Sequence, residues 1–241
     1  MCLLSWNVVM TLLSRSDSMC YMTNGTAEYG ERPMAQAPAS PRSRAGRTDE
    51  TREALLAAAH DLLATEGPTA LTVRRIAAAA GVSTMNVYSR FGGKDGVLDE
   101  LFIHGFQRMS DEMADSPTSD DPIEDLMECG RAYRAFARNN PTYYSLMFDR
   151  VAPDFEPSDR AIETALAGHA RVIDRVQRAM EAGAIRRGDP FQVASALWAC
   201  DHGLASLEYR TPAGARSELF DWDAISETAM RAMLRGLAPD S

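Results

Sequence analysis

Apolar residues recur along this chain at three- and four-residue spacings, the pattern of helices that bury one face. Leu55, Ala59 and Leu62 show it early in the chain, and Leu98 and Leu101 show it later. Glycine and proline interrupt the pattern, and no alternation long enough for a strand is visible. The sequence therefore predicts an all-α protein. The nine expected helices cover approximately residues 48–66, 72–80, 83–91, 94–116, 122–139, 141–148, 158–183, 190–210 and 222–235.

Three small helices are expected to form an N-terminal module that is distinct from a larger helical body. The module spans residues 46–93 and the body spans residues 94–241. Residues 1–45 are expected to be a disordered extension, because their second half is rich in glycine, proline, alanine and serine. Met22 and Met34 lie just ahead of the module, and we expect translation to start at one of them.

Neither a secretion signal nor a membrane anchor is expected. An apolar stretch lies within Met1–Leu13, but no basic residue precedes it, as a signal peptide would require. The stretch is also too short to cross a bilayer. The four cysteines (Cys2, Cys20, Cys129 and Cys200) do not have zinc-binding spacing. We therefore expect a cytoplasmic protein with reduced thiols and no membrane partner.

The charge of the chain is distributed unevenly. The composition is that of a globular protein, with 45% apolar and 24% charged residues and a net charge of −9. An even distribution of that charge would argue against nucleic-acid binding. Residues 41–94, however, hold eight basic and five acidic residues, a local charge of +3, which leaves −12 for the rest. A basic module on an acidic body favours two different partners, of which DNA is one.

Residues 71–91 have the features of a helix-turn-helix. Gly81 gives the backbone freedom for a tight turn, and Ala77 and Ala80 are small enough for two helices to cross closely. Val82 would fill the angle between them. The second helix is then free to lie in the major groove of DNA.

The polar side of that second helix supplies the predicted base contacts. Asn86 can pair with an adenine edge, and Met85 can contact a thymine methyl group. Phosphate contacts are expected from residues that flank the helix. The complete predicted set for double-stranded DNA is Thr72, Arg74, Ser83, Thr84, Met85, Asn86, Tyr88 and Lys94. The alternative is a purely structural three-helix cluster, which the local positive charge and the polar helix face disfavour.

Here the sequence resembles TetR/AcrR-type repressors, most closely over residues 48–95. The resemblance rests on three segments, Gly81-Val82-Ser83, Val87-Tyr88-Ser89-Arg90-Phe91 and Gly92-Gly93-Lys94-Asp95. It implies a homodimeric transcriptional regulator that binds an operator and is released by a small-molecule effector. Met85 and Arg90 depart from the usual pattern, so the resemblance does not imply an operator sequence.

Aromatic and sulfur-bearing side chains gather in the first half of the body. Such residues at helical spacing are often core, but they also line ligand cavities between helices. The residues proposed to line a ligand site are Phe102, Phe106, Met109, Cys129, Tyr133, Tyr144, Met147, Trp198 and His202. An apolar or weakly cationic effector would suit this lining, with Tyr133 and His202 orienting it. A lone histidine on an apolar helix is more often a core residue than a ligand contact, so His202 keeps both interpretations.

Small residues form a stripe on helix 190–210. The predicted dimer contact consists of Ser195, Ala199, Gly203 and Ser206, with the apolar Leu197, Cys200, Leu204 and Leu207 on the opposite side. We expect this helix to pack on its symmetry mate in a four-helix bundle. The last helix would join the bundle through Ile225, Met230, Met233 and Leu234.

A second resemblance covers roughly residues 122–210. Trp198, His202-Gly203 and Tyr133-x-x-Phe136 are similar to a TetR subgroup known for a Trp-His-Gly motif, as is the stretch Asn140-Pro141-x-Tyr143-Tyr144. This resemblance does not identify a ligand.

The sequence contains no motif for a catalytic nucleophile, a phosphate loop or a metal site. The expected protein is therefore not an enzyme and needs no cofactor or metal. Two alternatives remain: an enzyme that uses His202, and a redox sensor that uses Cys129 and Cys200.

Overall fold

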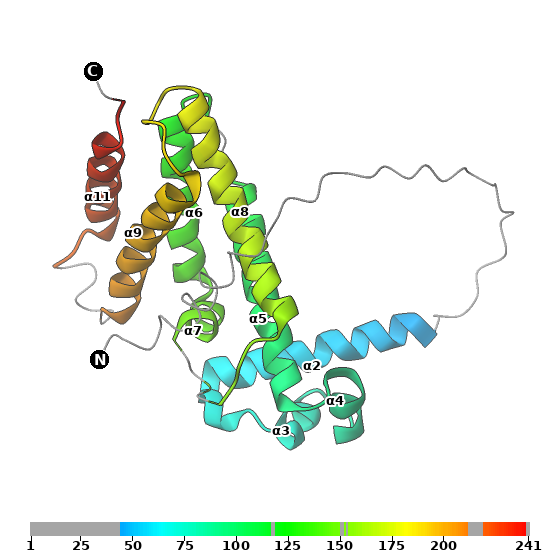
Figure 1. Ribbon diagram of the computed structural model, residues 1–241. Coiled ribbons are helices and arrows are strands. Elements are labelled where there is room, and N and C mark those ends of the chain that lie inside the picture. Colours follow the sequence, from blue (N-terminus) through cyan, green and yellow to red (C-terminus); the bar gives the residue numbers. More distant parts are fainter. Residues whose placement is uncertain (1–43, 117–118, 150–151, 153, 212–218, 240–241) are drawn as a thin grey trace, which may run out of the picture. The chain divides into compact units, whose positions relative to one another are not determined.

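The computed structural model describes residues 44–116, 119–149, 152, 154–211 and 219–239 (Figure 1). Within these ranges the chain forms nine α-helices, one 3₁₀ turn and no strand, which confirms the predicted all-α class. The chain divides at Lys94 into two compact units. Residues 1–43, which make up nearly all of the predicted extension, lie outside the described residues. No helix in the described ranges is long and apolar enough to span a membrane.

The first unit packs short helices around a small apolar core. Its elements are α2 (Arg44–Glu66), η2 (Pro68–Ala70), α3 (Val73–Ala79) and α4 (Thr84–Phe91). Leu55, Ile76 and Val87, one from each α-helix, are completely buried. The sequence predicted that the first helix would be capped by Thr48, but α2 begins earlier, at Arg44. Arg44, Ala45 and Arg47 favour a helix, and α2 includes them although Gly46 does not favour one.

Three glycines set the turns around α4. Gly81 has a φ of 67° between α3 and α4, and Gly92 has a φ of 74° at the end of α4. Gly93 follows with a φ of 148°. Other residues rarely adopt these backbone angles, so the glycines fix where the helix begins and ends. Phe91 is held by α2, because the Arg52 guanidinium lies 5.4 Å from the centre of its ring.

The second unit is a bundle of longer helices (Figure 1). The helices are α5 (Lys94–Ala114), α6 (Pro122–Asn139), α7 (Pro141–Phe148), α8 (Asp159–Glu181), α9 (Pro190–Arg210) and α11 (Trp222–Gly236). Side chains immediately before α6, α8, α9 and α11 accept hydrogen bonds from the first-turn amides of these helices, and each of them therefore fixes a helix start. These caps are Asp121, Ser158, Asp189 and Asp221.

Helix α9 is central in this unit because α6, α8 and α11 all pack against it. The shared core includes Leu126, Val176, Leu197, Met230 and Leu234. Met230 and Leu234 are thus buried within their own protomer, whereas the sequence pattern had indicated a dimer contact for them. Their spacing of four residues directs both side chains to the same face of α11.

Ion pairs join α6 to its neighbours. Arg131 bonds Glu227 of α11 at 3.0 Å. Arg134 bonds Glu208 of α9 at 2.9 Å, and both of these side chains are largely buried. Arg175 of α8 bonds Asp125 of α6 at 2.9 Å. The buried charges of Arg134, Glu208 and Asp125 are therefore compensated across helix contacts, which fixes how these helices are aligned.

Candidate DNA-binding surface and ligand cavity

Helix α4 presents a solvent-exposed face. Met85 is 69% exposed and Tyr88 is 54% exposed, although both are large and apolar or aromatic. Thr84 and Ser89 are also exposed, while Val87 is buried against α2 and α3. Exposed side chains of this kind are available for contact with a partner. The face therefore has the shape and chemistry for contacts with base edges.

Asn86, which was predicted to contact a base, makes two side-chain hydrogen bonds within the first unit. Its Nδ2 donates to Ser83 Oγ at 3.1 Å, and its Oδ1 accepts from Arg90 at 2.8 Å. Both ends of the amide are thus engaged within the helix. The amide nitrogen has a second hydrogen and the oxygen a second lone pair, so a bidentate contact with adenine would share the amide with Ser83 and Arg90. The sequence does not show this, because Arg90 and Asn86 meet only once the helix has formed.

The residues predicted to contact phosphate lie around α4. Thr72 caps α3, where its Oγ1 accepts from the Arg75 amide at 3.3 Å. Arg74 and Lys94 are exposed, at the start of α3 and of α5 respectively. Arg75 is paired with Glu66 and is therefore partly neutralised. The exposed amides and cations of this unit are suitable for phosphate binding.

His202, on α9, meets two buried tyrosines from other helices. Its Nδ1 lies 3.0 Å from the hydroxyl of Tyr133 and 3.0 Å from that of Tyr144. Burial lowers the pKa of His202 and raises that of both tyrosines. Nδ1 of the neutral histidine can therefore accept a hydrogen bond from a tyrosine hydroxyl, and both hydroxyls keep their protons. The polar groups expected to orient an effector bind each other instead.

The rings around this cluster form a tightly packed core. Phe148 lies 5.0 Å from Tyr144 and 4.9 Å from His202, between ring centres. Trp198 lies 5.8 Å from His202. Six residues of the predicted ligand lining lie in buried or packed positions and border neither cavity described below. They are Phe102, Phe106, Met109, Tyr144, Met147 and His202.

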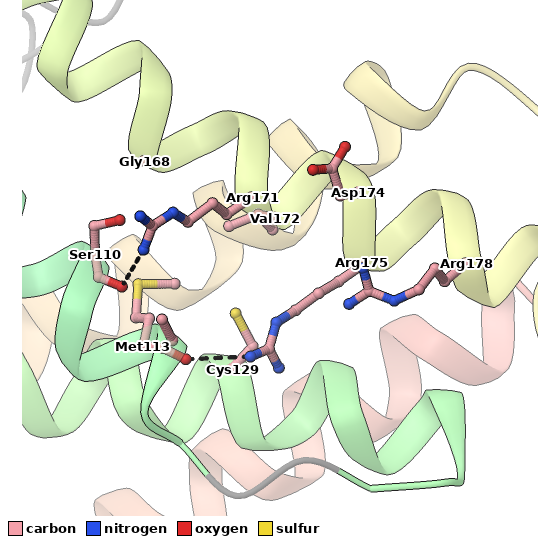
Figure 2. A pocket seen from close by; sticks show the side chains of 10 residues that line it. Ser110, Met113, Cys129, Gly168, Arg171, Val172, Asp174, Arg175 and Arg178 are labelled. Atoms are coloured by element: carbon pink, nitrogen blue, oxygen red, sulfur yellow. Dashed lines mark hydrogen bonds between the residues drawn. The ribbon is translucent and has the colours of Figure 1, made fainter. Parts of the chain in front are cut away.

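A cavity of about 220 Å³ lies between α5, α6 and α8, and we call it the outer cavity (Figure 2). Figure 2 shows Arg171, Arg175 and Arg178 along α8 on one side of it, with Met113 and Cys129 from the other two helices. Arg175 donates to the Met113 carbonyl at 3.2 Å and to Asp125. The predicted lining contained no arginine, because sequence spacing alone could not place α8 beside α5.

A second and much smaller cavity, the inner cavity, has a volume of about 20 Å³. Met113, Cys129 and Val172 border both cavities, so the two adjoin. The inner cavity is also bordered by Leu126, Gly130, Tyr133, Leu197, Trp198, Asp201 and Met230. Cys129, Tyr133 and Trp198 of the predicted lining therefore border cavities in this unit.

Asp201 is the residue of this site that sequence reasoning missed. Its side chain is buried in a core-facing stripe of α9, between Leu197 and Ala205. Its Oδ1 has no hydrogen-bond partner among the described residues. Burial raises the pKa of Asp201 to about 7, while the charge of Arg134 acts in the opposite direction. An acidic residue at core-facing helical spacing was the signal that could have revealed it.

The outward face of α9 carries small and apolar side chains. Ala199 is exposed, Gly203 has open space where a Cβ would be, and Leu207 is 59% exposed. Leu207 had been assigned to the opposite, inner side, but Glu208 occupies that side instead. Ser195 turns toward α8 and lies 3.2 Å from His169, so it leaves the predicted stripe. Ser206 is half-buried and accepts from Arg210 at 3.3 Å.

The thiols of the body are not activated. Burial raises the pKa of Cys129 to about 11 and also raises that of Cys200. Thiolate is the reactive form, so these surroundings disfavour a redox sensor. No group of potential metal ligands occurs within the described residues.

Comparisons with known proteins agree with this arrangement. Residues 55–101 match the family described as "Bacterial regulatory proteins, tetR family", and residues 126–233 match "Tetracyclin repressor-like, C-terminal domain". The chain belongs to the TetR family of transcriptional regulators. The family domain at the N-terminus is a DNA-binding helix-turn-helix, and in this chain it includes α3, α4 and the Gly81 turn.

Relatives of this TetR-family chain include the transcriptional regulator Rv1816 of Mycobacterium tuberculosis, which is 25% identical over 154 residues. That match covers 61% of this chain and 66% of the relative, slightly less than two thirds of its length. A solved protein from Rhodococcus sp. RHA1 is 26% identical, with a TM-score of 0.67 over 78% of this chain and 95% of the other. The solved putative regulatory protein SCO4313 is 23% identical, with a TM-score of 0.66 over 80% and 99%; it supports the fold alone.

Proposed function

We propose that this TetR-family protein is a homodimeric, cytoplasmic repressor that leaves its operator when a small hydrophobic effector binds the second unit. The exposed face of α4 carries the DNA part of the proposal. Met85 and Tyr88 stand in solvent on a helix whose other side is fixed by Val87. A fold-only role would favour polar residues at both exposed positions.

The proposed contacts with base edges come from Thr84, Met85 and Ser89. The proposed contacts with phosphates come from Tyr88 and Lys94. Asn86 is proposed to hold the helix surface in shape through Ser83 and Arg90. Thr72 and Arg74 add phosphate contacts at the start of α3. The rest of the protein is acidic, so DNA binding depends on these few local cations. Because the contacts are electrostatic, binding should be stronger at low salt concentration.

The effector part of the proposal is supported by the adjoining cavities of the second unit. The outer cavity is large enough for several carbon atoms, and the inner cavity that adjoins it is bordered by Tyr133 and Trp198. Helix α5 borders both cavities through Met113 and continues from the first unit at Lys94. A ligand that prefers one position of α5 would shift the balance between DNA-binding and released states.

The homodimer is proposed to form on the outward face of α9, through Ala199, Gly203 and Leu207. These residues are small or apolar; Ala199 and Leu207 are exposed in the single chain, and Gly203 is half-buried. A two-fold related copy would cover them and pair two DNA-binding units. An operator with two half-sites about one helical turn apart would then match the dimer.

Selection from random DNA duplexes tests the proposed function. The purified full chain should enrich a near-palindrome, and the same protein with Met85 and Tyr88 replaced by serine should not. Far-UV circular dichroism should be equal for both proteins, because the two positions are exposed. Failure of the wild-type protein to enrich any sequence would contradict the proposal. Repression would then be checked with the selected site placed over a reporter promoter.

A further inference from the structure

Asp201 carries a buried charge for which the fold provides no full complement of partners. The residue is only 6% exposed, and its Oδ1 is shielded from solvent without a hydrogen-bond donor among the described residues. Burying an unpaired carboxylate costs several kcal/mol. A leucine at this core position would avoid that cost. The cost is therefore most simply explained by a donor that comes from outside the chain.

The fold makes room for this carboxyl at one helix crossing. Gly130 on α6 lies directly against it, and a Cβ there would come within 2.8 Å of Asp201 Oδ2. Arg134 is the cation that acts on Asp201, but it is bonded to Glu208 and Asp223. A side chain at position 130 would therefore require the Asp201 carboxyl to shift.

The surroundings of Asp201 suit a small cationic group on an apolar body. The inner cavity has room for about one water-sized group, which is also the size of an ammonium group. Its walls are apolar or aromatic apart from Asp201 and the Cys129 thiol. The rings of Tyr133 and Trp198 border the same space, and aromatic faces attract cations.

The outer cavity gives the rest of such a molecule a place. It joins the inner cavity at Met113, Cys129 and Val172, and it is about ten times larger. The arginines that line the outer cavity lie near acidic side chains, which partly compensate their charges. Arg175 is bonded to Asp125, and Arg171 lies 3.8 Å from Asp111. A hydrocarbon chain can therefore lie across the cavity while its charged end sits further in.

We propose that Asp201 binds the ammonium group of an apolar primary amine whose hydrocarbon part extends past Cys129 into the outer cavity. The proposal rests on the proposed effector-controlled function and names the class of the effector. The bond would be a charge-assisted hydrogen bond in an apolar space, the kind that discriminates strongly against uncharged analogues.

Calorimetric titration of the full chain without DNA tests the site. The probes are octylamine, octanol and octanoate, which share one chain and differ in charge. Octylamine should bind at least ~10-fold tighter than octanol at pH 7.5. The Asp201→Asn variant should lose that difference and leave octanol binding unchanged. The matched control is Asp174→Asn, an exposed acid at the outer cavity, which should keep the difference.

A second measurement uses only the wild-type protein, so its result does not depend on whether the Asp201→Asn variant folds. The preference for octylamine over octanol should shrink as the pH falls from 8 to 5, since a protonated carboxyl cannot attract a cation. Cys129, Cys200 and Tyr133 lie near Asp201, and their raised pKa values keep them neutral in this range. Burial lowers the pKa of the adjacent His202, which favours its neutral form. A pH-independent preference would overturn the proposal.

Three further results would overturn it. Tighter binding of octanoate would mean that the arginines select the ligand. Equal binding of all three probes, or of none, would leave water as the partner of Asp201. An unchanged preference in Asp201→Asn would place the charge recognition elsewhere. These outcomes can be distinguished from failure of the proposed function, because operator binding is measured in a separate assay on the same protein preparations. If octylamine binds through Asp201 but the operator complex persists, the site stands and effector release fails.

Discussion

Gly130 on α6 and Asp201 on α9 form a matched pair, in which the missing side chain of one makes space for the carboxyl of the other. A Cβ on Gly130 would lie 2.8 Å from Oδ2 and 2.9 Å from Oδ1 of Asp201. Neither residue can be changed to a larger one without moving the other. The pair also explains how α6 and α9 approach closely although a charged group lies between them.

Gly130→Ala is expected to destabilise the protein by ~1–3 kcal/mol, as overpacking of a core contact does. Urea unfolding measures the loss. Most of it should vanish in the Asp201→Ala background, because the clash is with the carboxyl. Gly168→Ala is the control: its Cβ would meet Ser110 at an ordinary 3.7 Å, so stability should hold or rise slightly. Equal losses in both backgrounds would show that the clash involves another group.

The raised pKa of Asp201 predicts a pH-dependent stability difference between wild type and Asp201→Asn. The folded carboxyl takes up its proton near a pKa of about 7, and the unfolded one near the ordinary pKa of 3.8. Between these values the folded state binds the extra proton. The contribution of Asp201 to the free energy of unfolding of the wild type therefore falls by up to ~1.4 kcal/mol for each unit by which the pH rises. It stays constant above pH 7.

Asp201→Asn lacks this titration, so its stability relative to wild type should increase from pH 5 to pH 7.5 and then stay constant. Urea unfolding at four pH values measures the trend. Groups with lowered pKa values, such as Glu124 and Asp223, lose their stabilising effect only as the pH falls toward their own range. They occur in both proteins and cancel in the comparison. A flat difference would show that Asp201 stays charged when buried.

Measured affinities for DNA should distinguish residues that contact bases from residues that contact phosphates. Met85→Ala is expected to cost ~1 kcal/mol at one base position, because a thymine methyl contact is lost. Lys94→Ala should weaken all sequences alike and make the salt dependence shallower. Asn86→Ala should also weaken all sequences alike, since its amide bonds Ser83 and Arg90 within the helix. Binding to single-base variants of the selected operator, at several salt concentrations, measures each effect. A loss confined to one base in Asn86→Ala would restore the base-reading role.

Helix boundaries could be predicted well from the sequence, because the signals that set them are local. Gly81 and Gly92 need left-handed backbone, and Asp121 and Asp189 cap the helices that follow them. Each of these acts within a few residues, so the pattern along the chain was enough. Only the first helix start was missed, where good helix formers extend α2 beyond Thr48.

The ligand region was harder to predict, because it depends on which helix faces meet. Aromatic spacing correctly placed Tyr133, Trp198 and His202 near one another, but it could not show that the two tyrosine hydroxyls would share His202. Leu207 and Glu208 are neighbours in sequence and lie on different faces of α9. An apolar residue facing out and an acid facing in contradict the simplest pattern, and they occur where binding is proposed.

Gly203→Leu tests the proposed dimer face. No atom lies within 4 Å of the position that a Cβ would take, so one protomer can accept the larger side chain without strain. Sedimentation should show a shift toward monomers, and operator affinity should fall because half of the phosphate contacts are lost. Thermal unfolding at low concentration should change little. Gly188→Ala, another open glycine outside the α9 face, is the control and should keep the dimer. An intact dimer in Gly203→Leu would refute the interface.

Two substitutions distinguish a ligand-orienting role of the His202 cluster from a structural one. Tyr133→Phe removes one of two hydroxyls near Nδ1, and Tyr144 remains to donate, so stability should fall by no more than ~1 kcal/mol. His202→Ala removes a ring packed against Phe148 and Trp198 and leaves both hydroxyls without that acceptor, so a loss of ~2–4 kcal/mol is expected. Urea unfolding measures both. Octylamine titrations of Tyr133→Phe then report on the ligand, because this protein stays folded. A weaker octylamine affinity with unchanged stability and operator affinity would assign Tyr133 to the ligand, whereas unchanged octylamine affinity would leave the cluster as core packing that supports the inner cavity.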